Sequence, residues 1–394
     1  MKVKYRYTLS YKFFRFLGTL ILPRKFSFVY DKIKVKHSPY IVVANHVSYW
    51  DPILITMSFK KHMYFLASDE IMRFGLWGKL VTIFFNPISK TRAVNETNAV
   101  INIFRRLRSG RNICIFPEGI TTFDGETGKI IPSINKLIKK AGVSLVTYRF
   151  SGAYLTFPKW AATIRKGKLS GNLVRVYSTE EIKAMSEEEL YKVIVNDLYA
   201  NAYEEQKTNK IAFRGERLAE HLETVLYCCP RCREFAALTS KDDRLFCKCG
   251  FHVRYTEYGF FEGTEEEPPF TTILEWSKWQ KEEMAKLAEK AQSYDSNTPV
   301  FTDHDQRLSV ILKSKLPIRE KNCTLSIYNN RLSIIFDTGS TLDFPFNTIT
   351  EMTTFSNKTL VFSVKDNGHY EIKPKNHTSA IKYQDFFNLT VNRE

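Results

Sequence analysis

Short apolar runs alternate with longer amphipathic segments through the first half of this sequence. Strands are predicted for five apolar runs of five or six residues each, at 40–44, 63–67, 112–116, 144–149 and 173–177. Helices are predicted between them, at 52–59, at 69–85, at 96–109, which Gly110 follows as a C-cap, and from Pro132 to Gly142. This alternation predicts an α/β fold built on a mixed sheet.

Two further helices are predicted after the last of these strands. Ser186 and Glu189 have the spacing of a capping box, in which each side chain bonds the other residue's main-chain amide, at the start of a helix over 186–206. The run Arg214-Gly215-Glu216-Arg217 then leads into a helix that continues to Leu226.

The last hundred residues have a different pattern, of short alternating strands separated by turns. Strands are predicted at 307–313, 322–328, 331–336, 341–345, 348–353, 358–364 and 368–373, and a helix from Thr378 to Asn388. Asn329-Asn330 and Asp366-Asn367-Gly368 are typical of tight hairpin turns. This order of strands and terminal helix resembles a pleckstrin-homology-type β-barrel. Because that fold binds lipids in some relatives and proteins in others, it assigns no ligand.

The segment Asn45-His46-Val47-Ser48-Tyr49-Trp50-Asp51 directly follows the first of the predicted strands. An imidazole and a carboxylate make a general base and the partner that orients it. On a helix, five positions turn through about 500°, which separates the two side chains. We therefore expect a loop entering a helix, with Asp51 near the N-cap and Pro52 at the first helical position. In such a turn Asp51 folds back onto one imidazole nitrogen and leaves the other free to accept a proton.

A second motif, Phe116-Pro117-Glu118-Gly119, follows a later strand. Together the two motifs resemble those of the PlsC-like glycerolipid acyltransferases, the family of lysophosphatidic acid acyltransferases, over residues 35–170. The resemblance implies that His46 deprotonates an acceptor hydroxyl, which attacks a fatty acyl thioester, while Asp51 orients His46. It also implies binding of the phosphorylated acceptor by Glu118 and Gly119. The flanking motif residues Asn45, Ser48, Phe116 and Pro117 are assigned to the same substrate site.

A third block of the family corresponds to Asn86-Pro87-Ile88-Ser89-Lys90-Thr91-Arg92. Its phosphate-binding arginine falls on Lys90, or on Arg92 with a shift of two positions. A lysine supplies a point charge in place of a bidentate guanidinium. The fourth block is only loosely matched by residues 143–148, so the identity of the acceptor stays open. Acyl-CoA and acyl carrier protein both present phosphopantetheine thioesters, and either is an acceptable donor.

Charge changes the picture at the N-terminus. The chain has 58 basic and 42 acidic residues, a formal charge of +16, which indicates an anionic partner. Ten of the first 36 residues are Lys or Arg, interleaved with aromatic residues and the apolar run from Phe16 to Leu22. This composition suits a helix in the headgroup layer of an anionic membrane, although a cationic helix packed on its own domain has the same pattern.

No apolar run approaches the roughly 20 residues of a membrane span, and no signal-peptide cleavage site is recognisable. We expect a monotopic protein on the cytoplasmic face of the membrane.

Five of the seven cysteines fall within 22 residues. Cys229-Pro230-Arg231-Cys232 and Cys247-Lys248-Cys249-Gly250 resemble the two turns of a zinc ribbon, with one residue between the second pair where two are usual. Cys228 and His252 are alternative ligands, and buried or disulfide-bonded cysteines are an alternative to the metal. Four thiolates, at Cys229, Cys232, Cys247 and Cys249, leave no open position on Zn²⁺, so the metal is expected to be structural.

The chain is thus divided as follows: a basic membrane-associating segment (1–36), an acyltransferase domain (37–215), a zinc ribbon (216–262), a helical linker (263–299) and a C-terminal β domain (300–394). A zinc-ribbon protein that binds nucleic acid would also be basic, but it would not need the two motifs at strand ends. A lipid-binding protein on the same fold would not need both His46 and Asp51. We therefore expect an acyl thioester donor and a lysophospholipid acceptor as partners, and no nucleic acid.

Overall fold

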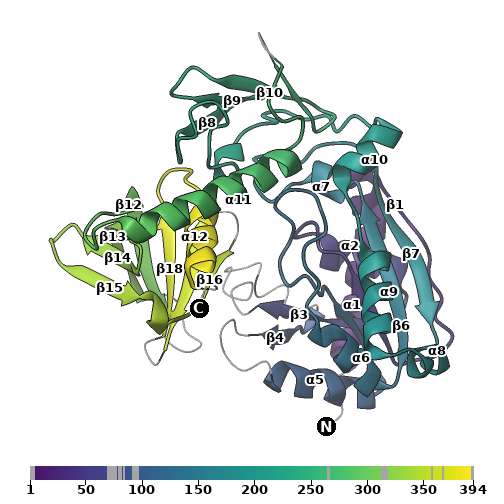
Figure 1. Cartoon of the computed structure of the whole chain (residues 1–394). Coiled ribbons are helices and arrows are strands. Elements are labelled where there is room, and N and C mark those ends of the chain that lie inside the picture. The colour runs from purple at the N-terminus through teal and green to yellow at the C-terminus, as the bar shows by residue number, and fades with distance from the viewer. Residues whose placement is uncertain are drawn as a thin grey trace. The chain divides into compact units, whose positions relative to one another are not determined.

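The computed structural model describes residues 5–68, 78, 82, 85–90, 97–263, 267–311, 318–355, 358–365 and 368–391 (Figure 1). The chain forms two compact units. The first comprises residues up to 159 together with 164–215, and the second comprises 160–163 and everything from 216 onward. The finer division into five parts stays a prediction.

The first unit is an α/β structure around one mixed sheet. Its helices are α1 (Tyr5–Phe26), α2 (Asp51–Ser58), α5 (Thr97–Arg108), α6 (Ser133–Ala141), α7 (Ala153–Thr156), α8 (Thr179–Ala184), α9 (Glu187–Leu198) and α10 (Ala202–Asn209). Its strands are β1 (Phe28–Tyr30), β2 (Tyr40–Ala44), β3 (Met63–Ser68), β4 (Ile88–Lys90), β5 (Asn112–Ile115), β6 (Ser144–Ser151) and β7 (Leu169–Tyr177). The five predicted strands are therefore all present.

The sheet has the strand order β1-β7-β6-β2-β5-β3-β4. The strands from β6 to β4 run parallel to their neighbours, whereas β7 is antiparallel to β6 and carries β1 parallel to itself. Apolar side chains of α5, α6 and α9 pack with those of the central strands in one buried core. In the parallel register Val43 lies beside Ile115, so the carboxyl ends of β2 and β5 are adjacent. The two sequence motifs begin at these ends.

Helix α1 packs against α2 with one of its faces. Tyr11, Leu22 and Phe26 are buried on this face. Arg15 on the same face donates to the carbonyls of Thr56 and Met57 at the last turn of α2, at 3.1 and 2.9 Å. A cation is favourable there because the carbonyls at a helix C-terminus have no partners within the helix. No helix in the described ranges is long and apolar enough to cross a membrane.

Two of the predicted helices differ in the structure. The capping box of Ser186 and Glu189 is formed, but the predicted helix over 186–206 is broken into α9 and α10 because the Asn201 side chain accepts the amides of Tyr203 and Glu204 and starts a new helix.

The predicted helix up to Leu226 is wrong. Only a short 3₁₀ turn, η1 (Leu222–Thr224), forms there, because Arg217 and His221 adopt left-handed conformations with φ of 55° and 75° that a helix does not allow. The predicted helix at 69–85 lies almost wholly outside the described residues.

The second unit begins with a small sheet and a long helix. Strands β8 (Leu238–Lys241), β9 (Arg244–Cys247), β10 (His252–Tyr255) and β11 (Phe261–Glu262) form an antiparallel sheet in the order β11-β10-β9-β8. Helix α11 (Ile273–Lys290) starts at a capping box of Thr272 and Glu275. Its buried Trp276 donates to the carbonyl of Cys228 at 2.9 Å, so this helix is packed on the cysteine-rich segment.

The rest of the second unit is a C-terminal β domain with a closing helix. It contains β12 (Phe301–Ile311), β13 (Ile318–Ile327), β14 (Arg331–Phe336), β15 (Thr341–Pro345), β16 (Ile349–Phe355), β17 (Thr359–Val364), β18 (Gly368–Pro374), the turns η2 (Ala291–Ser293) and η3 (Phe346–Thr348), and α12 (Ile381–Val391). The strands form one antiparallel sheet in the order β15-β14-β13-β12-β18-β17-β16. The seven predicted strands and the terminal helix are confirmed, although β12 begins six residues earlier than predicted.

Candidate active site and metal centre

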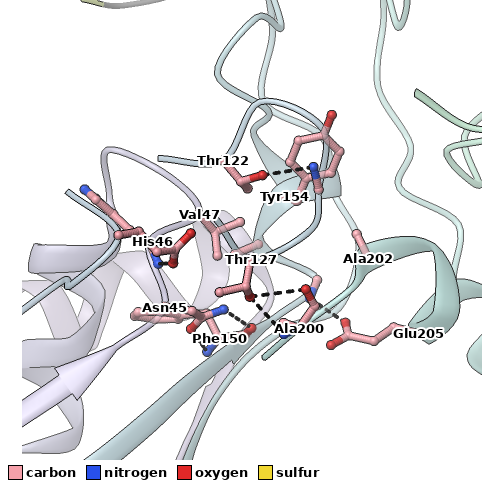
Figure 2. Close-up of a pocket in the computed structure, with 14 residues that line it drawn as sticks. Asn45, His46, Val47, Thr122, Thr127, Phe150, Tyr154, Ala200, Ala202 and Glu205 are labelled. Atoms are coloured by element: carbon pink, nitrogen blue, oxygen red, sulfur yellow. Dashed lines mark hydrogen bonds between the residues drawn. The ribbon is translucent and has the colours of Figure 1, made fainter. Parts of the chain in front are cut away.

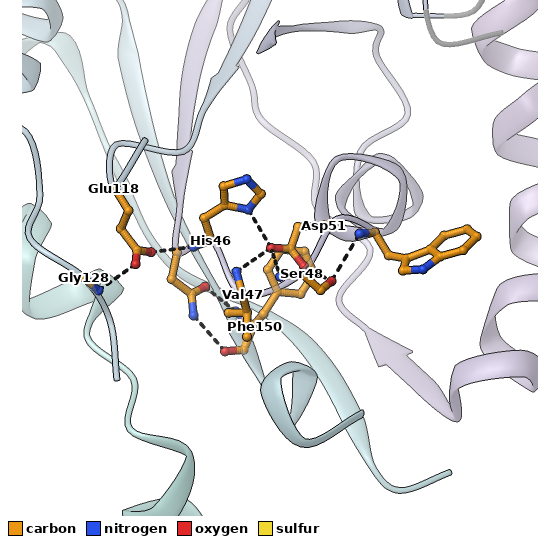
Figure 3. Close-up of polar contacts among 9 residues, drawn as sticks. His46, Val47, Ser48, Asp51, Glu118, Gly128 and Phe150 are labelled. Atoms are coloured by element: carbon orange, nitrogen blue, oxygen red, sulfur yellow. Dashed lines mark hydrogen bonds and ion pairs between the residues drawn. The ribbon is translucent and has the colours of Figure 1, made fainter. Parts of the chain in front are cut away.

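The loop between β2 and α2 places His46 against Asp51 (Figure 3). The Nδ1 atom of His46 lies 2.9 Å from Oδ2 of Asp51, and the imidazole is 18% exposed whereas the carboxylate is fully buried. The imidazole also stacks on the ring of Phe116, with centroids 4.4 Å apart. A carboxylate at Nδ1 favours the tautomer with its proton on that nitrogen, which leaves Nε2 as the proton acceptor.

The Asp51 carboxylate organises the whole loop. Its Oδ2 atom accepts the amides of Val47 and Ser48 at 2.6 and 2.9 Å, in addition to the imidazole, and its Oδ1 accepts the Ser48 hydroxyl at 2.6 Å. Donors on all sides match an ionised carboxylate, which can only accept hydrogen bonds. The helix itself starts at Asp51 with Pro52 in the first turn and Trp50 as N-cap. The predicted fold-back of Asp51 onto the imidazole is therefore present. The Asp51 side chain bonds the amides of the preceding loop and does not cap its own helix.

The second motif forms a tight turn directly after β5. The amide of Gly119 donates to the carbonyl of Phe116 at 3.1 Å, and Gly119 has φ of +77°, which suits glycine at this position. Pro117 occupies the second position of the turn, where its fixed φ is favourable. Glu118 then points toward the histidine loop. Its Oε1 atom accepts the His46 amide at 2.5 Å and its Oε2 accepts the Gly128 amide at 2.6 Å.

Glu118 is a buried carboxyl group, with only 8% of its surface exposed. Burial raises its pKa to about 8, and the amides of His46 and Gly128 oppose that rise. The negative charges of Asp51 and Asp124 raise the pKa further. The histidine loop thus bonds two carboxyl groups, that of Asp51 at the start of α2 and that of Glu118 in the turn after β5.

A small pocket extends from the histidine loop to α10 (Figure 2). Its walls combine Gly and Ala residues with Asn45, Thr122, Thr127, Glu118 and Glu205. The Glu205 carboxylate accepts the Gly152 amide at 3.3 Å, and burial raises the pKa of Glu205. Thr122, Gly128 and Glu205 had no signal in the sequence, since only the folded chain brings them beside the two motifs.

The structure brings together most, but not all, of the predicted substrate-site residues. Asn45 and Ser48 are buried and bonded within the loop and sheet. Lys90 is the last residue of β4, at the same carboxyl edge of the parallel strands as the start of the histidine loop. Arg92 lies outside the described residues. The phosphate-binding role of either basic residue stays a prediction.

The four predicted metal ligands form a compact cluster in the second unit. The sulfur atoms of Cys229, Cys232, Cys247 and Cys249 all lie within 4.8 Å of one another. The Cys229–Cys249 and Cys232–Cys247 sulfur distances are 3.8 and 3.7 Å. A tetrahedron with Zn–S bonds of about 2.3 Å has sulfur–sulfur edges of about 3.8 Å, so the cluster fits a metal of this size.

The residues around the cluster agree with this ligand set. Gly250 has φ of +88° and donates its amide to the carbonyl of Cys247, which forms the second turn. Cys228 points elsewhere, since its sulfur lies 3.6 Å from the carbonyl of Arg233. The Nδ1 atom of His252 lies 3.2 Å from the carbonyl oxygen of Gly250. All seven cysteines lie within the described ranges, and none of them forms a disulfide there.

Comparison with known proteins agrees with the motifs. The family described as "Acyltransferase" matches residues 27–151. These residues form an acyltransferase-family domain. A curated 1-acyl-sn-glycerol-3-phosphate acyltransferase from Borreliella burgdorferi is 25% identical over 112 residues, which is 28% of this chain and 45% of that protein. The family match and this relative support the PlsC-like family.

Two solved structures are also similar to parts of the chain. The crystal structure of the 1-acyl-sn-glycerophosphate acyltransferase PlsC from Thermotoga maritima has 26% identity and a TM-score of 0.40, covering 48% of this chain and 75% of that one. The crystal structure of human RhoA in complex with the DH/PH fragment of PDZRHOGEF has 11% identity and a TM-score of 0.18, covering 31% of this chain and 43% of that one. TM-scores this low do not establish a shared fold.

Proposed function

We propose that this acyltransferase-family protein transfers a fatty acyl group from an acyl thioester to the hydroxyl of a lysophosphatidic acid-type acceptor, in phospholipid biosynthesis. The observation that carries this proposal is the pairing of His46 with the fully buried Asp51 at the carboxyl end of β2. The curated relative, whose name states this reaction, is matched over less than half of its own length.

In the proposed reaction, Nε2 of His46 takes the proton of the acceptor hydroxyl as the oxygen attacks the thioester carbonyl. Asp51 stabilises the imidazolium that forms, because its carboxylate lies on Nδ1. Collapse of the tetrahedral intermediate forms the ester bond and breaks the carbon–sulfur bond. The imidazolium then returns the proton to the departing thiolate, so His46 is regenerated.

The phosphate of the acceptor requires cations near the histidine. Lys90 is the last residue of β4, which pairs in parallel with β3, so its backbone lies at the carboxyl edge of the sheet. We therefore assign the phosphate contact to Lys90 or to Arg92, which follows it by two positions. Donors that carry phosphopantetheine, whether acyl-CoA or acyl carrier protein, present the same thioester to His46.

The cysteine cluster is proposed to hold one structural Zn²⁺. Four thiolates at tetrahedral spacing saturate zinc, so the metal would supply folding energy and no chemistry at the acyl group. The cluster belongs to the second unit of the chain, whereas His46 and Asp51 belong to the first. We propose that the acyltransferase domain over 37–215 catalyses the reaction and that the segments after it have roles other than catalysis.

Membrane association is proposed to use the outer face of α1. Four apolar residues spaced three or four positions apart, Leu9, Phe13, Phe16 and Leu20, are 48–62% exposed. On a helix this spacing gathers them into one stripe, opposite the face that packs on α2. The charged residues Lys12 and Arg24 flank the stripe. Apolar rings with neighbouring cations suit the interface of an anionic bilayer on its cytoplasmic face.

The proposed reaction is tested by an assay of the purified chain with lysophosphatidic acid, glycerol 3-phosphate and other lysophospholipids, each with acyl-CoA and with acyl carrier protein. We expect esterification of lysophosphatidic acid with release of one thiol per ester formed. Transfer only to a different acceptor would correct the substrate, and the absence of transfer to every acceptor by well-folded protein would refute the function.

A further inference from the structure

Three consecutive main-chain amides of the histidine loop point at carboxyl groups. The His46 amide donates to Glu118, and the next two, from Val47 and Ser48, donate to Asp51. The carbonyl of His46 is also held, since it accepts the Thr122 amide at 3.0 Å. The main chain at His46 is thus fixed on both sides by the segment that follows β5. Figure 3 shows the bond from the His46 amide to Glu118.

Glu118 has little capacity left for a substrate. Both of its oxygens accept main-chain amides, at 2.5 and 2.6 Å, and the side chain is buried. The approach of Gly128 is also close, because a Cβ atom at that position would lie only 3.2 Å from Oε2 of Glu118.

We propose that Glu118 is a positioning residue, which holds the main chain of His46 against Asp51 and leaves acceptor binding to other groups. The inference rests on the proposed acyl transfer and differs from the role that the family motif implies for Glu118. Asp51 acts from α2 and Glu118 from the turn after β5, so the imidazole is fixed by two elements that are distant in sequence. Moving either element would move the proton acceptor relative to the substrate.

The substitution Glu118→Gln separates the two roles. A glutamine has one acceptor oxygen and one NH₂ group, so one of the two amides, of His46 or of Gly128, would face a donor and lose its bond. We expect kcat to fall between about tenfold and 10²-fold, because small displacements of a catalytic group have effects of this size. The KM for the acceptor should change by less than about threefold.

Two further variants control this experiment. Glu371→Gln changes a glutamate of the second unit that is as buried as Glu118, at 7% exposed, and that pairs with Lys373 and not with the histidine loop, so it should leave kcat within about twofold. Gly128→Ala keeps the Glu118 side chain but places a methyl group against its Oε2. This variant should also lower kcat, by a smaller factor than Glu118→Gln does. Gly128→Ala decides the question if Glu118→Gln does not fold.

A measurement independent of turnover completes the test. In ¹⁵N-edited NMR spectra, the ring signals of His46 are identified by their loss in His46→Gln. We expect the Nδ1 proton that bonds Asp51 to shift and exchange faster in Glu118→Gln, and to be unchanged in Glu371→Gln. A raised acceptor KM at constant kcat, or an unchanged His46 spectrum, would overturn the positioning role. If the wild-type chain transfers no acyl group, the proposed reaction fails, while the spectra still decide the role of Glu118.

Discussion

The side chain of Asn45 is bonded to the main chain of Phe150 by two hydrogen bonds. Its Nδ2 atom donates to the Phe150 carbonyl at 3.0 Å, and its Oδ1 accepts the Phe150 amide at 2.8 Å. The last paired residue of β2 is Ala44, so Asn45 continues the β2–β6 pairing with its side chain after the backbone ladder has ended. The loop that carries His46 therefore starts from a fixed point in the sheet.

Asn45→Ala should destabilise the fold. It leaves the amide and carbonyl of Phe150 buried without partners, and two such losses cost about 2–6 kcal/mol in the free energy of unfolding. Urea unfolding of the two proteins measures this difference. The matched control is Asn172→Ala on β7, where the asparagine is exposed, which should change stability by less than about 0.5 kcal/mol. Equal stability of both variants would show that the two bonds are unimportant.

The catalytic pair should tolerate removal of its charge without loss of the fold. In Asp51→Asn, the amide oxygen can occupy the position that accepts the imidazole and two main-chain amides, while the NH₂ group faces the Ser48 hydroxyl, which can accept it. We expect a folded protein in which kcat is lower by about 10² or more, as in His46→Ala. Activity and circular dichroism are compared on the same samples. Near-normal turnover in either variant would rule out the assigned base.

The local part of this site was predictable from the sequence, and the rest was not. His46 and Asp51 share one short loop, so their spacing was enough to predict a turn that brings them together. The contact from Glu118 to His46 spans 72 positions and depends on the parallel pairing of β2 with β5, which short-range patterns do not encode. Gly128 joins the site only because its amide reaches Glu118 from a loop without a recognisable motif.

The fold was predicted best where apolar runs are short and bounded by turns. The central strands of the first unit and the seven strands of the last domain have this pattern. The helix predicted up to Leu226 failed because left-handed backbone at Arg217 and His221 is set by tertiary contacts, such as the bond from the His221 amide to the Ser240 hydroxyl at 2.7 Å. β1 was missed because its three residues are too few to show a period.

Stability should depend on the ionisation of Glu118. Its pKa is about 8 in the folded protein, against 4.5 for an ordinary glutamate, so between these values the folded chain binds more protons than the unfolded chain. The free energy of unfolding therefore falls as pH rises from about 5 to 8, and this contribution levels off above that range. Glu118→Gln cannot ionise and should show a flatter dependence. Urea unfolding at several pH values measures both slopes, and parallel curves would contradict the raised pKa.

Binding to anionic vesicles should depend on the exposed stripe of α1. Deletion of residues 1–30 is a poor test, because it also removes the buried Tyr11, Phe26 and Phe28. The double substitution Phe13→Ser with Phe16→Ser leaves the packed face intact and should weaken vesicle binding at least about tenfold, since each ring loses apolar burial in the bilayer.

The control for this experiment changes exposed apolar residues far from α1 in sequence. Leu342→Ser with Tyr258→Ser removes two exposed side chains, 41% and 40% exposed, from the second unit. Vesicle sedimentation is measured at low and high salt, with anionic and with neutral lipid. We expect binding of the wild type to weaken with salt and to need anionic lipid. Equal sedimentation of the stripe variant and the control would place the membrane contact elsewhere.

The cysteine cluster should contain about one zinc per chain, and its loss should affect structure more than chemistry. Cys229→Ser removes one of four thiolates, so zinc should be lost and amide exchange should increase over residues 226–262 and at the end of α11 where Trp276 bonds Cys228. Cys228→Ser is the control, because this neighbouring thiol bonds the carbonyl of Arg233 instead of joining the cluster.

Turnover should fall much less in Cys229→Ser than in His46→Ala, since four thiolates leave zinc no position for a substrate. Elemental analysis, hydrogen exchange and activity are measured on the same preparations. Absence of zinc from the wild type, or loss of all turnover on zinc removal while the first unit stays protected from exchange, would contradict a structural metal.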